Sequence, residues 1–188
     1  MLNVGLLGAG RIGQLHAMNI AGHGESRLAA VSDAHPPAAE ALAARWGAQV
    51  AATDAIVADP AIDAVLIATP TDTHSELIEA ATAAGKAVFC EKPVDLDLAR
   101  ARACGAAAAA TELPVMVGFN RRFDVNIRAM KTALDAGEIG RPEMLSITSF
   151  DPAPPPIAYV ETSGGLFRDM TIHDFDMSRF LMGASPVT

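Results

Sequence analysis

Short apolar runs alternate with longer alanine-rich stretches over the first 120 residues of the chain. The runs show little alternation of apolar and polar positions, which is typical of strands buried on both faces. They cover residues 3–8, 27–32, 63–68, 87–90 and 115–119. The stretches between them favour helix, and they cover residues 11–22, 36–46, 54–58, 74–84 and 97–110. Strands that alternate with helices predict right-handed crossovers and a doubly wound parallel α/β sheet of the Rossmann type.

The pattern changes near residue 120, and we place a domain boundary there. A helix is expected from Arg122 to Ala136, ended by Gly137, and then a strand over residues 143–150. A proline-rich loop and a helix that begins near Asp169 follow. The sequence therefore predicts a first domain over residues 1–120 and part of an α+β domain over residues 121–188.

Composition narrows the class of protein. The 188 residues are 51% hydrophobic and 19% charged, as expected for a globular chain. The net charge of −8 is spread over isolated carboxylates with no basic stripe, which argues against nucleic acid or an anionic membrane as partner. Cys90 and Cys104 form no cluster suited to a metal, and we interpret both as reduced packing residues. No signal peptide and no spanning apolar run is visible, so the expected location is the cytoplasm.

Residues 8–13 read Gly-Ala-Gly-Arg-Ile-Gly and connect the first strand to the first helix. This is the Gly-x-Gly-x-x-Gly turn of dinucleotide-binding folds. Gly8 permits the tight turn, Gly10 lets the backbone approach a pyrophosphate, and Gly13 lets the helix pack on the strand. The pyrophosphate is then expected at the helix N-terminus, where free amides favour an anion.

An acidic residue, Asp33, stands at the end of the second strand, 20 positions after Gly13. A carboxylate there accepts hydrogen bonds from the ribose hydroxyls of the adenosine and repels a 2′-phosphate. No arginine follows at Ala34-His35-Pro36 to bind such a phosphate. We therefore expect NAD rather than NADP. The alternative for Asp33, an N-cap of the next helix, is compatible with this role.

Two further strand ends carry candidate residues. Thr69 and Pro70 follow the third expected strand and are expected to border the cofactor, whereas His74 is interpreted as part of a helix start. Glu91-Lys92-Pro93 follows the fourth. From position alone, Lys92 is as consistent with a solvated surface residue as with a catalytic one.

Asp169 and His173 lie four positions apart, just after Gly164-Gly165. If Asp169 opens a helix, the two side chains are about 40° apart around its axis, so the carboxylate can orient the imidazole. That is the geometry of a supported general base. The alternative is an N-cap aspartate and a surface histidine.

Four motifs together resemble, in order and spacing, the glucose-fructose oxidoreductase, inositol dehydrogenase and MocA family. They are residues 8–13, 91–93, 118–124 and 164–176. Residues 151–156 and 170–176 resemble its inositol-oxidising branch in particular.

This resemblance implies hydride transfer from a secondary hydroxyl of a cyclic polyol to NAD, with Lys92, Asp169 and His173 as catalytic residues. Oxidation of myo-inositol to the 2-keto inositol is favoured, and a pyranose sugar or another polyol is the alternative. A histidine is suited to accept the hydroxyl proton near neutral pH. Asp169 would orient His173, while Lys92 would hold the substrate oxygen and stabilise its developing charge.

The resemblance also assigns residues to the two ligands. Those expected to bind the cofactor are Gly8, Gly10, Arg11, Ile12, Gly13, Asp33, Thr69, Pro70, Glu91 and Lys92. Those expected to bind the substrate are Lys92, Asn120, Asp169 and His173. The turn at Glu91-Lys92-Pro93 is expected to shape the nicotinamide pocket through a cis peptide bond before Pro93.

The second domain of family members is longer than the 68 residues that follow residue 120 in this chain. Only one strand of its sheet is evident, and a lone strand cannot form a stable sheet. We therefore expect an incomplete substrate and oligomerisation domain. A homo-oligomer is implied for a full-length member, with the state of this chain left open. A dinucleotide-binding fragment without turnover remains a third interpretation.

Overall fold

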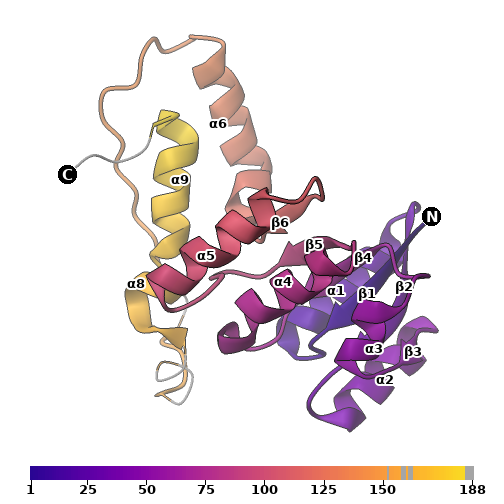
Figure 1. Cartoon of the computed structure of the whole chain (residues 1–188). Coiled ribbons are helices and arrows are strands. Elements are labelled where there is room, and N and C mark those ends of the chain that lie inside the picture. The colour runs from indigo at the N-terminus through magenta and orange to yellow at the C-terminus, as the bar shows by residue number, and fades with distance from the viewer. Residues whose placement is uncertain (152, 158–159, 161–162, 185–188) are drawn as a thin grey trace. The chain divides into compact units, whose positions relative to one another are not determined.

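A computed structural model describes residues 1–151, 153–157, 160 and 163–184 of the chain (Figure 1). The chain divides into two compact units, Met1–Gly118 and Phe119–Thr188. The first unit holds a sheet with helices on both faces, and the helices of the second unit pack on one another.

The first unit is built on a six-stranded sheet in which every neighbouring pair of strands is parallel. The strands are β1 (Leu2–Leu7), β2 (Ser26–Ser32), β3 (Gln49–Val50), β4 (Ala64–Ile67), β5 (Ala87–Cys90) and β6 (Val115–Val117). Their order is β3-β2-β1-β4-β5-β6, so the winding direction reverses between β1 and β4. This is the Rossmann order, and ligands bind such sheets at the reversal point.

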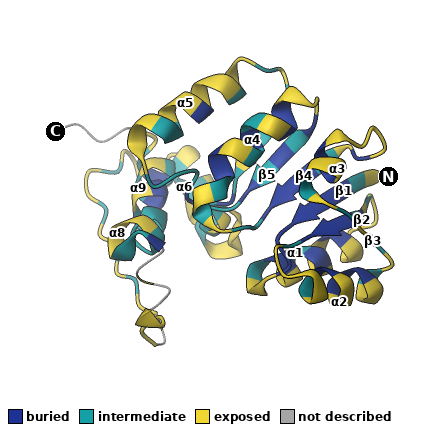
Figure 2. Ribbon diagram, turned by 60° about the horizontal axis from the view of Figure 1, so that its bottom comes forward, coloured by how far each residue is buried: buried dark blue, intermediate teal, exposed yellow. Residues whose placement is uncertain are grey.

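Five helices cover the two faces of this sheet. They are α1 (Arg11–Gly22), α2 (Pro36–Trp46), α3 (Thr53–Ala58), α4 (His74–Ala83) and α5 (Leu98–Ala109). Figure 2 shows α1 and α2 on one face and α3, α4 and α5 on the other. The predicted doubly wound α/β fold is confirmed. Among the described residues, the pattern missed one strand, β3, whose two residues are both exposed and show no apolar run.

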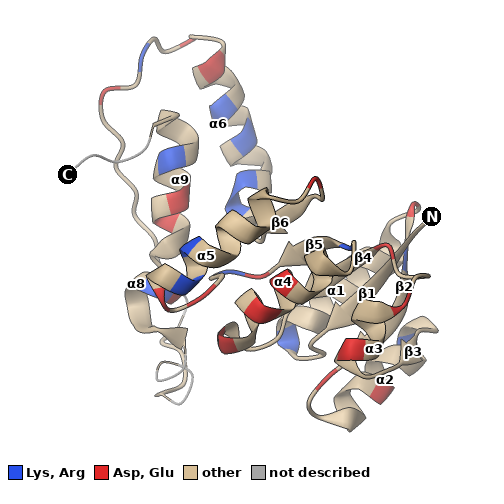
Figure 3. Cartoon of the chain, in the orientation of Figure 1, with Lys and Arg blue, Asp and Glu red and all other residues tan. Residues whose placement is uncertain are grey.

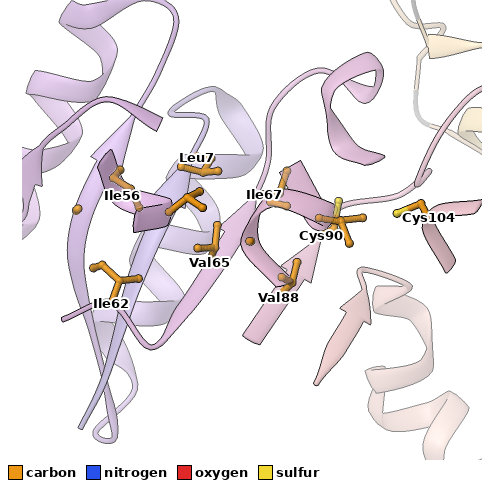
Figure 4. Close-up of a cluster of buried hydrophobic side chains, with 12 residues drawn as sticks. Leu7, Ile56, Ile62, Val65, Ile67, Val88, Cys90 and Cys104 are labelled. Atoms are coloured by element: carbon orange, nitrogen blue, oxygen red, sulfur yellow. The ribbon is translucent and has the colours of Figure 1, made fainter. Parts of the chain in front are cut away.

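Two separate hydrophobic cores explain why the strand sequences are apolar without alternation. Leu6 and Leu66 pack with residues of α1 and α2, while Leu7, Val65 and Ile67 pack with residues of α3, α4 and α5 (Figure 4). Successive side chains of a strand point to opposite faces, so a sheet covered on both faces needs apolar residues at every position. The continuous apolar run is thus the sequence signature of this two-sided burial.

The second unit contains a 3-10 turn η2 (Asn120–Phe123) and the helices α6 (Val125–Asp135), α8 (Gly165–Asp169) and α9 (Ile172–Met182). The helix expected from Arg122 begins three residues later, at Val125. Asp124 caps it by accepting hydrogen bonds from the backbone N–H groups of Asn126 at 2.9 Å and Ile127 at 3.2 Å. Its carboxylate supplies the partner that the first amides of a helix lack.

The strand expected over residues 143–150 is not formed, although all eight of these residues are described. Their side chains are partly or fully exposed, with Phe150 at 88%. An alternating sequence becomes a strand only when another strand supplies the hydrogen-bond partners. No described residue of the second unit forms such a partner strand. None of the described helices is long and apolar enough to cross a membrane.

Candidate active site

The last residues of four strands lie in one row across the sheet. Ser32, Leu7, Ile67 and Cys90 are successive partners in the parallel register. The residue that follows each strand is therefore brought to the same edge, the carboxyl edge, where doubly wound sheets bind ligands. The glycine turn, Asp33, the Thr69 loop (residues 68–73) and the Lys92 turn (residues 91–93) all begin there.

The glycine turn is closely packed at its two ends and open in the middle. Gly8 has a φ of +100°, and a Cβ there would lie 2.5 Å from the carbonyl oxygen of Ala68. A Cβ on Gly13 would lie 1.9 Å from the carbonyl oxygen of Gly8. At Gly10, by contrast, no described atom lies within 4 Å of that position, and the residue is exposed. Gly10 is also the N-cap of α1, so the first amides of the helix border this open space.

Asp33 joins the glycine turn to the end of β2. One carboxylate oxygen accepts a hydrogen bond from the backbone N–H of Ala9 at 2.6 Å, and the other accepts one from His35 at 2.7 Å. The N-cap of α2 is His35, so the alternative role of Asp33 as that cap is wrong. The carboxylate stands beside the first glycines of the turn, where the ribose of a dinucleotide is expected.

The Lys92 turn has a cis peptide bond between Lys92 and Pro93, as expected. Glu91 is hydrogen-bonded to His16 of α1, with 2.7 Å between Oε1 and Nε2, and the His16 ring meets Phe89 edge-on at 5.2 Å between centroids. Burial acts to raise the pKa of Glu91, but the hydrogen bond and charge of His16, with those of Lys92, outweigh it and hold that pKa below its ordinary 4.5. Glu91 is therefore an anion near neutral pH.

The pair of His16 and Glu91 connects the helix of the glycine turn to the turn that carries Lys92. Sequence analysis missed His16, because the two partners are 75 positions apart. One signal was present, since His16 comes three positions after Gly13 and so faces the same side of α1.

The buried thiols serve packing. Cys90 and Cys104 are both free and buried, and burial, followed by the charge of Glu91, raises the pKa of the Cys90 thiol. A thiol with a raised pKa is a poor nucleophile. No group of three or more His, Cys, Asp or Glu side chains within the described residues could hold a metal ion.

Asp169 and His173 do not share a helix. Asp169 ends α8, and His173 lies in the first turn of α9, with Met170 and Thr171 between the two helices. The expected spacing of about 40° around one axis is therefore wrong, because the chain changes direction between them. The His173 ring lies edge-on to Phe119, with 6.3 Å between centroids and 88° between planes.

Ion pairs hold the start of the second unit to α9. Arg122 donates to both carboxylate oxygens of the buried Asp176, at 2.7 and 2.5 Å. Arg121 donates to Asp174 at 2.5 Å, and Ser149 donates to the same carboxylate at 2.7 Å. Figure 3 shows acidic residues on α9, and both α6 and α9 carry basic and acidic residues. These contacts place η2, which begins at Asn120, against the helix that carries His173.

The predicted site residues thus fall in both units. Gly8, Gly10, Gly13, Asp33, Thr69, Pro70, Glu91 and Lys92 meet along one sheet edge of the first unit. Asn120, Asp169 and His173 belong to the second unit. The grouping of Lys92 with Asp169 and His173 as one catalytic set remains a prediction.

A parallel sheet in Rossmann order, with a glycine turn at its reversal point and an acid after β2, defines a dinucleotide-binding protein. The particular family follows from comparison with known proteins. The family described as "Oxidoreductase family, NAD-binding Rossmann fold" matches residues 2–119, and the GFO/IDH/MocA C-terminal domain matches residues 127–188. The chain belongs to the GFO/IDH/MocA family, which confirms the resemblance of its motifs.

Individual relatives are close. The chain is 58% identical over 184 residues to the inositol 2-dehydrogenase of Rhizobium meliloti, a match that covers 98% of this chain and 56% of that protein. A crystal structure of a putative myo-inositol dehydrogenase from Sinorhizobium meliloti has a TM-score of 0.96 and 57% identity, covering 100% of this chain and 57% of that one. The scyllo-inositol dehydrogenase of Lactobacillus casei with bound NAD(H) and scyllo-inositol has a TM-score of 0.85 and 36% identity, with coverages of 97% and 56%. The chain thus spans little more than half the length of these relatives.

Proposed function

We propose that this chain takes part in the oxidation of a secondary hydroxyl of a cyclic polyol, with NAD as hydride acceptor and myo-inositol as the first substrate to test. The observation that carries the proposal is the row of strand ends at the carboxyl edge of the sheet. It brings the glycine turn, Asp33 and Lys92 to one edge. Hydride transfer requires the cofactor and the alcohol to lie close together, and this edge carries the residues proposed for both. The close relatives named for inositol oxidation support the choice of substrate.

The residues at this edge fit a dinucleotide. The open space over Gly10 would be filled by the Cβ of any other residue, and it borders the first amides of α1, which favour a pyrophosphate. Asp33 would accept hydrogen bonds from the adenosine ribose, and Thr69 and Pro70, which follow the strand next to that of the glycine turn, would border the cofactor. Bound NAD would supply the hydride acceptor.

The protein itself has to hold the alcohol and remove its proton. We propose that Lys92 holds the substrate oxygen and stabilises the charge that develops on it. His173 would accept the hydroxyl proton as general base, since an imidazole takes up protons near neutral pH. Asp169 would orient His173 across the bend at Met170 and Thr171, and Asn120 would donate to a substrate hydroxyl.

The division of labour follows the two units. We propose that residues 1–120 bind NAD and that residues 121–188 supply the first part of the substrate domain. The chain spans 56% of the length of its Rhizobium relative. Its turnover and its substrate are therefore proposed here and not taken over from that relative. A pyranose sugar as substrate, or NAD binding without turnover, are the two other outcomes that the experiment must separate.

Reduction of NAD, followed by absorbance with myo-inositol or glucose, tests the proposal. We expect turnover with myo-inositol to exceed that with glucose, and His173→Ala to reduce it by about a hundredfold or more. His23→Ala is the matched control, because His23 is exposed at the far end of α1 and should leave the rate unchanged. Calorimetry of NAD binding to each variant shows whether the cofactor site is intact.

Three results would contradict particular parts of the proposal. Full turnover in His173→Ala would remove His173 as the base. Faster reaction with glucose would change the substrate class. NAD binding without any turnover would leave the chain a dinucleotide-binding fragment, and equal affinity for NADP would overturn the role of Asp33.

We further propose that the protein acts in the cytoplasm and that a full-length member of the family is a homo-oligomer, with the state of this chain left open. The dispersed negative charge is compatible with a small-molecule enzyme that binds neither nucleic acid nor membrane. Light scattering after size-exclusion chromatography measures the mass of the assembly and so decides the oligomeric state of this chain.

A further inference from the structure

His74 is the first residue of α4, yet its side chain is turned into the protein and is only 1% exposed. Its Nδ1 lies 2.7 Å from the carbonyl oxygen of Pro93, and its Nε2 lies 2.8 Å from the carbonyl oxygen of Thr69. Both ring nitrogens therefore face backbone acceptors. The interpretation of His74 as part of a helix start is confirmed, and the burial of its side chain is the feature that the sequence did not show.

The two acceptors belong to different loops. Thr69 is in the Thr69 loop, which follows β4, and Pro93 is in the Lys92 turn, which follows β5. The two strands are neighbours, with Ile67 opposite Cys90 at their ends. One buried ring thus spans the two backbone segments that leave adjacent strands at the carboxyl edge of the sheet.

The Thr69 loop is held from its other side as well. The hydroxyl of Thr73 donates to the carbonyl oxygen of Pro70 at 2.7 Å and lies 2.7 Å from the hydroxyl of Thr69. Because the Thr73 hydrogen is used on Pro70, the Thr69 hydroxyl donates to Thr73. The loop is therefore ordered within itself, and His74 connects it to the Lys92 turn.

We propose that His74 is a positioning residue that sets the separation of the Thr69 loop from the Lys92 turn and so shapes the nicotinamide end of the cofactor site. The proposal rests on the proposed function, in which the first of these segments borders the cofactor and the second carries Lys92. A planar ring with a nitrogen on each side reaches two carbonyls in opposite directions. Which ring nitrogen donates depends on the tautomer, and an apolar side chain of similar size would leave the carbonyl that receives the N–H without its donor.

The chain contains a matched control for the loss of such bonds. Lys86 is 6% exposed, and its Nζ donates to the carbonyl oxygens of Asp59 at 2.5 Å and Ile62 at 2.7 Å. These bonds join the segments that precede β4 and β5, at the opposite edge of the same sheet. Lys86→Met therefore removes the same kind of contact between the same strands, far from the carboxyl edge.

The experiment compares NAD with ADP-ribose, which lacks the nicotinamide, by calorimetry on the whole chain. In His74→Leu we expect NAD affinity to fall about tenfold while ADP-ribose affinity stays within about twofold. In Lys86→Met we expect a lower melting temperature with both affinities unchanged. His74→Gln, whose amide keeps a donor but has no ring to lie between the two carbonyls, is a second variant should His74→Leu not fold.

Amide hydrogen exchange gives a readout that does not depend on the cofactor. His74→Leu should speed exchange in the Thr69 loop and in the Lys92 turn together, and Lys86→Met in neither. Faster exchange in only one of the two segments would overturn the proposal, as would equal weakening of NAD and ADP-ribose. If the unaltered chain binds neither nucleotide, the proposed function fails, and the exchange pattern still decides the role of His74.

Discussion

Gly13→Ala tests whether the glycine turn is needed for folding as well as for the cofactor. Gly13 lies buried in the first turn of α1, and the added Cβ would stand 1.9 Å from the carbonyl oxygen of Gly8 and 2.9 Å from its carbonyl carbon. Both atoms are backbone, so neither can turn aside as a flexible side chain could. The helix must instead move away from the strand.

The size of the effect follows from that overlap. Ordinary contact with a Cβ begins at 3.4 Å, so helix and turn must separate by about 1.5 Å. Overpacking of this kind costs about 1–3 kcal/mol, and an overlap with backbone belongs at the upper end. An alanine in the interior of a helix is otherwise better than glycine by about 1 kcal/mol. We expect a net loss of about 2 kcal/mol in the free energy of unfolding, or about 4–8 °C in melting temperature.

Thermal and urea unfolding followed by circular dichroism measure this loss. Gly105→Ala is the matched control, because Gly105 lies within α5 with no described atom within 4 Å of the added Cβ. That control should raise stability by about 0.5–1 kcal/mol. A Gly13→Ala chain as stable as the unaltered one would refute the close approach of α1 to the glycine turn.

Three further changes test separate parts of the structure. Gly10→Ala should keep the melting temperature, because the space around Gly10 is open, but reduce NAD affinity about tenfold or more by calorimetry; unchanged affinity would place the pyrophosphate elsewhere. The pKa of Glu91 is lowered in the folded chain, so its contribution to stability is present above pH 4.5 and is lost as the pH falls through the lower folded value. Glu91→Gln should therefore make the urea midpoint of unfolding depend less on pH on the acid side. An unaltered acid limb would show that Glu91 contributes nothing there. Asp176→Ala should lower stability by roughly 2 kcal/mol, since its buried carboxylate receives two charged hydrogen bonds, and speed hydrogen exchange in α9. Asp135→Ala, which breaks an exposed ion pair with Lys131, should change stability by less than about 1 kcal/mol, and a larger loss than at Asp176 would reverse this ranking.

The sheet and its helices could be predicted because their physical cause is local. A strand covered on both faces is apolar at successive positions, and a crossover helix is rich in alanine and leucine, so each element is visible in a few residues. The glycine turn is also local, since its residues follow one another between a strand and a helix. Where a local cause was missing, prediction failed, as it did for β3 with its two exposed residues.

Other features depend on partners that are distant in the sequence. Residues 143–150 have a strand-like sequence but form no strand, because ladder hydrogen bonds require a neighbour. The bend at Met170 and Thr171, which separates Asp169 from His173, occurs without a proline or glycine to mark it. Spacing alone therefore could not show that the two belong to different helices.

By itself, the sequence determined the α/β class, the place of the glycine turn, the acid at Asp33 and the lysine at the end of β5, because each follows from residues that are neighbours along the chain. Only the tertiary structure decided that Ser32, Leu7, Ile67 and Cys90 end in one row. It also decided that His16 pairs with Glu91 and that His74 joins Thr69 to Pro93. Strand register and burial set these contacts, and both arise only when segments far apart in sequence pack into one sheet.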